Sequence, residues 1–293
     1  MRKFLGAIAL MLLSPWAWAL APYVNGDRVA AGGIDDVMTV VENKLGKAGF
    51  TVIGKYAPAG LPGHGVIVVT DNALLGTVKS LGGANIVGAA LRVGVKSDGS
   101  VSYMNPDYWY RAYFRGGFKV AEKTIKAVQA KLGRTLGARG TFGGDVAKTD
   151  LSEYQYMFGM ESFDSDKNLL IEHLSFEDAV KAIQDNLAKG TAKTSKVYEV
   201  VVPEKKIAVF GVAMNDAKEG EGWWVKTIGT DNIAALPYEI YVVGGKAQHL
   251  FARYRIALGW PAVGMGQFMR IVEAPYIIQE TLAQVAGGAP AGK

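Results

Sequence analysis

The sequence predicts an α+β fold made of two similar two-layer domains. Each would be a largely antiparallel sheet with helices on one face, and the two would be related by pseudo-two-fold symmetry. The first observation is a motif, VKSLGGANI from Val78, that returns as VKTIGTDNI from Val225. The second is that β-rich segments occur in pairs separated by turn residues, which is typical of hairpins. The third is that helical periodicity recurs at matching places. An internal repeat of this kind indicates one domain written twice.

The first element predicted in each half is a helix. Apolar residues follow helical spacing over 35–49 and again over 177–190. Both segments begin with acidic residues and end in Lys-Gly or Lys-Ala-Gly, which suits the helix dipole and a left-handed helix end. The order expected in each half is helix, two strands, helix, two strands, a proline-containing turn (Pro106 or Pro261) and a last helix.

The strands are predicted from β-branched content and turn residues. Ser97-Asp98-Gly99 and Gly244-Gly245 are the two hairpin turns. The predicted strands are 50–56, 65–70, 89–96 and 100–104 in the first half, and 196–202, 207–214, 238–243 and 248–256 in the second, with 169–172 as a further candidate.

The domain boundaries follow from these elements. We expect a signal peptide at 1–19, a first repeat domain at 20–135, a linker or bridging segment at 136–165, a second repeat domain at 166–288 and a flexible tail at 289–293. Glycines crowd the stretch 133–144, as in a connection. In residues 154–160 of the bridging segment, aromatic and apolar residues alternate with polar or small ones, which fits either a strand or an irregular bridge.

The N-terminus has the three regions of a secretory signal peptide. Arg2-Lys3 is followed by an apolar run and then by small residues at Ala17 and Ala19, so cleavage is expected before Leu20. The alternative is an uncleaved anchor, but the apolar run is short of the ~20 residues that span a bilayer. We therefore expect a soluble periplasmic protein.

Composition excludes several classes of function. The chain has no cysteine, which excludes disulfides, thiolate nucleophiles and thiolate metal sites. The formal net charge of +5 falls to +3 without Arg2 and Lys3, and no dense basic run supports nucleic-acid binding. The three histidines are not at ligand spacing from one another, so no metal or other cofactor is predicted. No constellation for catalysis is recognised, and the balance favours a protein that is not an enzyme.

The segment with most functional potential is 105–115, NPDYWYRAYFR. Aromatic rings can form the apolar walls of a pocket, and guanidinium groups can bind an anion. In the second half the predicted strand 248–256 would place three basic side chains on one face, with a tryptophan after it. The predicted ligand-binding residues are Tyr108, Trp109, Arg111, Arg115, His249, Arg253, Arg255 and Trp260. The alternative is that the aromatics close the core or bury the contact between the repeats.

The run LRVGVKSDGSVSYMNP (91–106) resembles the domain of unknown function family numbered 302, and so does VENKLGKAGF (41–50). The resemblance extends more loosely to the second half. It implies a two-layer α+β fold whose single-copy members pair through a shared sheet, so that a tandem copy would form such a pair within one chain. It implies no catalytic residues.

The expected function is therefore to bind a small, partly apolar or anionic molecule in a cleft near the junction of the repeats. Two alternatives stay open. One is an accessory protein that docks a membrane or respiratory partner of the cell envelope through an aromatic patch. The other is an enzyme of unrecognised type.

Overall fold

The computed structural model describes residues 19–289. The expected signal peptide (1–19) lies outside the described residues apart from Ala19, and so does most of the expected tail. Over the described range the chain is a mixed α+β protein with two larger antiparallel sheets and nine α-helices. The α+β class predicted from the sequence is confirmed. We call residues 20–135 the first half and residues 166–288 the second half.

The segment that leads into the first strand of the first half is held by the start of helix α3 (Pro106–Phe114). The side chain of Asn105 caps α3 and also donates to Ala21 O at 2.8 Å. The elements are β2 (Tyr23–Asn25), α1 (Ile34–Lys47), β3 (Thr51–Tyr56), β4 (His64–Thr70), α2 (Asn72–Leu81), the 3-10 segment η2 (Gly83–Ala89), β5 (Leu91–Lys96), β6 (Val101–Met104), α3 (Pro106–Phe114), η3 (Arg115–Gly117) and α4 (Phe118–Leu136).

The second half runs through a comparable series. Ser175 caps α5 by accepting from Asp178 N at 3.0 Å. The elements are β9 (Leu169–Glu172), α5 (Phe176–Ala188), the 3-10 segment η6 (Thr191–Lys193), β10 (Thr194–Val202), β11 (Ile207–Met214), α6 (Glu221–Ile228), η8 (Ile233–Ala235), β12 (Tyr238–Val243), β13 (Lys246–Gln248), α7 (Ala252–Gly259), α8 (Met265–Met269) and α9 (Ala274–Val285).

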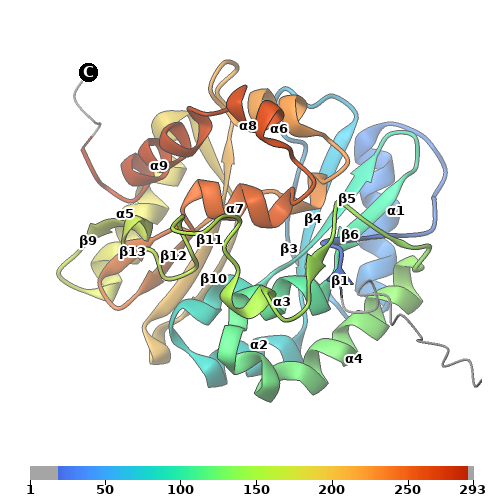
Figure 1. Cartoon of the computed structure of the whole chain (residues 1–293), viewed down its shortest axis with the longest axis horizontal. Helices are drawn as coiled ribbons and strands as arrows, with labels where there is room; N and C mark the ends of the chain where they lie inside the picture. Colours follow the sequence, from blue (N-terminus) through green and yellow to red (C-terminus); the bar gives the residue numbers. More distant parts are fainter. Residues whose placement is uncertain (1–18, 290–293) are drawn as a thin grey trace, which may run out of the picture.

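The two antiparallel sheets arrange their corresponding strands in the same order. The larger is β3-β4-β5-β6-β2-β7 and the smaller is β10-β11-β12-β13-β9. They stand next to each other, the smaller on the left in Figure 1 and the larger on the right. The predicted hairpins are confirmed: Lys96 N donates to Ser100 O at 2.9 Å across the first turn, and Val243 pairs with Lys246 across the second.

The sheets meet at their edge strands. β3 and β10 lie side by side, and a Cβ on Gly54 would come within 2.2 Å of Val197 O. The contact continues through the 3-10 segments, since η2 packs on β11 and β12 while η8 packs on β4, β5 and β6. One hydrophobic core runs through both halves. Position 54 therefore requires glycine, because any side chain there would prevent the edge strands β3 and β10 from approaching this closely.

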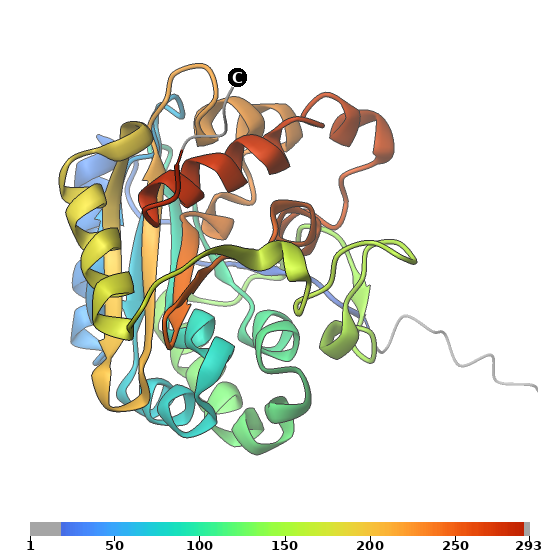
Figure 2. The same cartoon turned by 90° about the vertical axis from the view of Figure 1, so that its left-hand side faces the viewer.

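Helices cover both faces of the sheets, so the expectation of helices on one face is wrong. A Cβ on Gly65 would meet Met38 of α1 at 2.7 Å, whereas one on Gly94 would meet Ile233 of η8 at 2.3 Å. Gly65 pairs with Val95, next to Gly94, so these contacts lie on opposite faces. Figure 2 shows α1 (blue) and α5 (yellow) together on one side of the strands. The other face is filled by the segments through which the halves meet.

One further expectation is wrong, and the bridging segment takes a mixed form. The sequence predicts a strand at 248–256, but strand β13 ends at Gln248, and residues 252–259 form helix α7. The bridging segment is partly ordered into strands: β7 (Thr141–Phe142) joins the larger sheet beside β2, and β8 (Val146–Ala147) pairs with β1 (Ala19–Leu20). The alternating stretch 154–160 is not a strand but a series of turns.

Within residues 19–289, none of the helices combines the length and the apolar character that crossing a bilayer requires.

Candidate functional site

Some of the predicted binding residues form a buried charged cluster between the halves. The carboxylate of Glu239 (β12) pairs with Arg92 (β5), and Arg255 Nε (α7) donates to its other oxygen at 3.3 Å. Both guanidinium groups lie against the ring of Trp109 (α3), at 5.1 Å for Arg92 and 4.8 Å for Arg255. These four side chains are buried. We call Arg92, Glu239, Arg255 and Trp109 the junction cluster.

The surroundings of the junction cluster are filled with tyrosines. Arg92 Nη2 donates to Tyr113 Oη at 3.0 Å, and Tyr108 Oη donates to Leu258 O at 2.9 Å. Tyr108 and Trp109 are fully buried. In this conformation a ligand could reach these rings only by displacing protein, so they lie in the contact between the halves.

The remaining predicted residues of the second half lie apart from one another. Burial lowers the pKa of His249 to about 3, which keeps this core imidazole neutral. Trp260 Nε1 donates to Gly229 O at 2.9 Å. Arg253 Nη2 binds Glu161 at 2.5 Å, and this pairing holds the pKa of Glu161 at about 2. Arg253 and Arg255 are on a helix, two positions apart, and point in different directions.

Arg111 and Arg115, by contrast, line one cleft of about 410 Å³ on the first half. We call it the cationic cleft. Its charged lining consists of Arg111, Arg115, Lys119 and Lys148 with a single carboxylate, Glu122. Thr149 and Ser152 from the bridging segment add hydroxyl groups. The structure thus brings two of the eight predicted residues together in a solvent-accessible site.

The start of α4 adds a partial positive charge to the cationic cleft. The residue at the N-cap position is Gly117, so no side chain caps this helix, and its first turn has no acidic residue. Gly116, Phe118 and Lys119 line the cleft at this end. The Phe118 N–H already donates to Arg115 O of the preceding 3-10 turn, so the helix start contributes to the cleft mainly the positive end of the helix dipole.

The cations of the cleft differ in how far they are already paired. Arg111 binds Asp107 at 2.9 Å and lies over the Phe118 ring at 4.0 Å. Arg115 pairs with the exposed carboxylate of Asp164 in the bridging segment. Among the described residues Lys119 makes no ion pair. Arg115 also has φ of 48°, a conformation that non-glycine residues rarely adopt.

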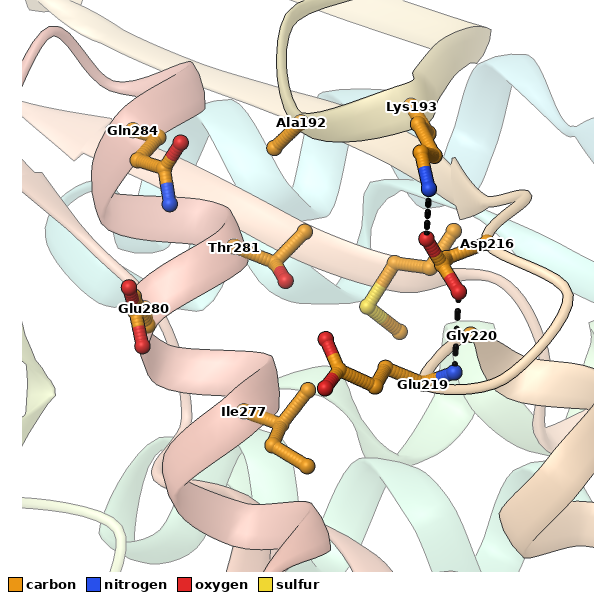
Figure 3. Close-up of a pocket in the computed structure, with 10 residues that line it drawn as sticks. Ala192, Lys193, Asp216, Glu219, Gly220, Ile277, Glu280, Thr281 and Gln284 are labelled. Carbon is orange, nitrogen blue, oxygen red and sulfur yellow. Dashed lines mark hydrogen bonds and ion pairs between the residues drawn. The ribbon is translucent and has the colours of Figure 1, made fainter. Parts of the chain in front are cut away.

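A second cavity, of about 250 Å³, lies on the second half between α9, η6 and the loop before α6 (Figure 3). Asp216 organises the loop by accepting from Lys218 N at 2.7 Å and Glu219 N at 3.0 Å, and it pairs with Lys193. These contacts lower the pKa of Asp216, with the Lys193 hydrogen bond first. Glu219 points toward Ile277 and Thr281 of α9 in Figure 3.

Sequence reasoning did not single out this second cavity. The signal was the extra stretch around 218–222, which interrupts the match between the halves. A second signal exists only in the backbone, because Ala192 (φ 51°) and Lys193 (φ 56°) are consecutive left-handed residues in the cavity wall.

A buried carboxyl group lies beside this loop. Glu221 is fully buried at the start of α6, and burial raises its pKa to about 8, although Tyr56 and the Met214 N–H lower it. Neither carboxyl oxygen has a partner at hydrogen-bonding geometry, and neither does the Tyr56 hydroxyl. Within the described chain, no three His, Cys, Asp or Glu side chains are placed to hold a metal ion.

Comparisons of the chain with protein-family models, with curated proteins and with solved structures found no match. The resemblance to family 302 therefore stays a prediction from the residues that carry it.

Proposed function

We propose that the chain is an internal pseudodimer, in which two copies of one domain pair as two subunits would. Both halves follow the order strand, helix, two strands, helix, two strands, helix, and both sheets place the strands in the same sequence. The contacts between the halves are reciprocal, since η2 packs on the second sheet and η8 on the first. These features support a pseudo-two-fold axis between β3 and β10.

The junction cluster supports the same proposal. Arg92 and Glu239 are separated by 147 positions, as are Lys79 and Lys226 of the repeated motif. They would therefore occupy one position in each copy. A symmetric dimer would bring two like charges together there, whereas this chain brings an arginine to a glutamate. Complementary charges at one position favour pairing within the chain.

We also propose that this exported, periplasmic protein binds a small anion in the cationic cleft and has no catalytic role. The single observation that carries this is the convergence of four cationic side chains on the uncapped start of a 19-residue helix. Phosphate, sulfate or carboxylate groups match this set, because guanidinium and ammonium groups bind their oxygens with charge-assisted hydrogen bonds and the helix dipole favours negative charge.

The cleft also suggests how a ligand would be admitted. Within the part of the chain that the structure describes, Asp164 pairs with Arg115 alone, and its side chain is 76% exposed. An anionic group of the ligand could replace this carboxylate on Arg115. The Phe118 ring lies 4.0 Å from the Arg111 guanidinium and the Phe163 ring 4.0 Å from that of Arg115. A ligand with an anionic group on a flat or apolar body would pair with the arginines and pack on these rings.

The test is calorimetry with inorganic phosphate, sulfate and benzoate at constant ionic strength, on the mature protein and on the double variant K119E/K148E. We expect binding to weaken at least tenfold in the variant, because two of the four cations become repulsive. The variant K123E is the matched control, because Lys123 is an exposed residue of α4 outside the cleft. Equal binding by wild type and K119E/K148E would exclude this site.

The alternative function, an accessory protein that docks an envelope partner, is favoured by one observation. Phe158 is 99% exposed and Met157 is 46% exposed at a turn of the bridging segment. Exposed aromatic side chains mark contact sites when they gather with other apolar residues. Chemical cross-linking of the wild type to an envelope protein, lost in F158S and unaffected by K119E/K148E, would favour docking over anion binding.

A further inference from the structure

The polar ends of Glu221 and Tyr56 are buried where α6 of the second half meets β3 and the following loop of the first, and the indole N–H of Trp224 is buried one turn further along α6. Four polar atoms of these side chains have no hydrogen-bond partner among residues 19–289: both Glu221 carboxyl oxygens, the Tyr56 hydroxyl and the Trp224 indole N–H. Glu221 and Trp224 are fully buried. Buried polar atoms are nearly always paired, so an unpaired group of this kind needs a physical reason.

The backbones are in close contact at the same place. A Cβ on Gly222 would come within 2.3 Å of Ala59 O, and one on Gly60 within 3.3 Å of Gly222 Cα. The start of α6 is thus pressed against the loop after β3, with no side chain between them. A charged carboxylate at Glu221 would be fully buried, without a cation of the described residues beside it, unless this contact opens.

We propose that Glu221 makes the contact between the two halves proton-dependent: the contact is closed while the carboxyl group is protonated and loosens when it ionises. We call Glu221 and Tyr56, together with the adjacent contact of Gly222 with Ala59 and Gly60, the acid junction. A neutral carboxylic acid can remain buried at far lower free energy than a carboxylate, and it can donate a hydrogen bond.

The groups that face Glu221 are few. Tyr56 comes from β3, and the Met214 N–H comes from the end of β11. Arg92 of β5 acts on the pKa of Tyr56, which is raised by burial and then by Glu221. The α8 helix, which packs on α6, carries no ionisable residue between Met265 and Met269. The loop residues 59 and 60 are Ala and Gly. Among the described residues, therefore, no cation is positioned to neutralise the ionised form.

The direction of the pH effect follows from linkage. The folded-state pKa of about 8 lies above the ordinary value of 4.5 that an opened junction would restore. Between these two values the closed state holds a proton that the open state has released, so each rise of one pH unit favours opening about tenfold. Stabilisation by the acid junction is complete below pH 4.5, and the effect levels off above pH 8.

Hydrogen exchange with mass spectrometry at pH 6, 7 and 8 tests this, read in peptides covering 55–61 and 215–228. After correction for intrinsic exchange, protection in the wild type should fall about tenfold per pH unit where opening is local. In E221Q, which cannot ionise, protection should not depend on pH. The control is E219Q, which removes a neighbouring exposed carboxylate and should keep the wild-type dependence of protection on pH. The same slope in E221Q as in the wild type would overturn the proposal.

Infrared spectroscopy gives a second readout that does not require E221Q to fold. The wild type should show a carboxylic acid C=O band at pH 6 that disappears with a midpoint near 8. Y56F should move this midpoint upward, because the Tyr56 hydroxyl lowers the pKa of Glu221. Absence of the band at pH 6 would contradict the proposal.

Discussion

The two halves differ most where their second long strand connects to the following helix. In the first half one residue, Asp71, joins β4 to α2, whereas in the second half the loop 215–220 joins β11 to α6. Asp71 caps α2 by accepting from Ala73 N at 2.9 Å and also binds Lys131 of α4 at 2.7 Å. The Lys131 ammonium lies over the Phe50 ring at 4.2 Å. Strand, helix and terminal helix are thereby tied together.

In the second half the corresponding carboxylate is used within its own loop. Asp216 binds the backbone of its loop and the exposed Lys193, and it makes no ion pair with α9. Whereas α2 packs on α4, α6 packs on the short helix α8, and the cavity of Figure 3 lies between the loop and α9. The same strand order is therefore compatible with a sealed and an open helix layer, depending on a few residues in the loops.

The largest effect should come from breaking the contact that both halves share. E239A leaves Arg92 and Arg255 buried without their carboxylate, and loss of one partner from a buried ion pair typically costs about 3–5 kcal/mol. We expect the free energy of unfolding, measured with urea, to fall by that amount, with both halves unfolding together. The control is R92M/E239L/R255M, which should recover much of the stability because apolar residues need no charge partner. A change below about 1 kcal/mol in E239A would mean that the cluster is hydrated.

The buried charges also show where sequence reasoning succeeds and fails. Hairpins could be predicted because Ser97-Asp98-Gly99 and Gly244-Gly245 are local turn signals. Helix α7 could not be predicted, because it is buried on most sides and its apolar residues therefore do not follow helical spacing. Buried Tyr254 and Ile256 at alternate positions are typical of a strand, and a strand would place the arginines of this segment on one face.

The junction cluster was missed because its partners are distant in sequence. Arg255 was singled out from its neighbours, but nothing local indicates that it shares a carboxylate with Arg92. One signal was present: Arg92 and Glu239 are charged residues inside otherwise apolar strand segments, and they are separated by 147 positions, like Lys79 and Lys226 of the recurring motif. Arg111 and Arg115 were predicted as anion-binding residues, whereas the hydroxyls of 149 and 152 come from a segment whose path depends on the tertiary fold.

The next comparison is between the two strand-to-helix connections. D71A removes a helix cap and the partner of Lys131, and the loss of a cap alone costs about 0.5–2 kcal/mol. D216A should have a smaller effect on the free energy of unfolding, because its partner Lys193 is solvated. Urea unfolding of both variants measures this difference. A larger effect for D216A than for D71A would show that the loop 215–220 is a main support of the second half.

The smallest expected effect concerns the backbone of the open cavity. Ala192 has φ of 51°, which for a residue with a Cβ costs roughly 1–2 kcal/mol relative to glycine. A192G should therefore stabilise the protein by up to about 1 kcal/mol after the added entropy of the unfolded glycine is subtracted. A188G, an exposed residue in the last turn of α5, is the matched control and should destabilise by roughly 0.5–1 kcal/mol. Thermal unfolding of the two variants separates these signs. If A192G destabilises as A188G does, the left-handed conformation at 192 is not strained, and the wall of the cavity in the second half is as relaxed as the sealed connection in the first.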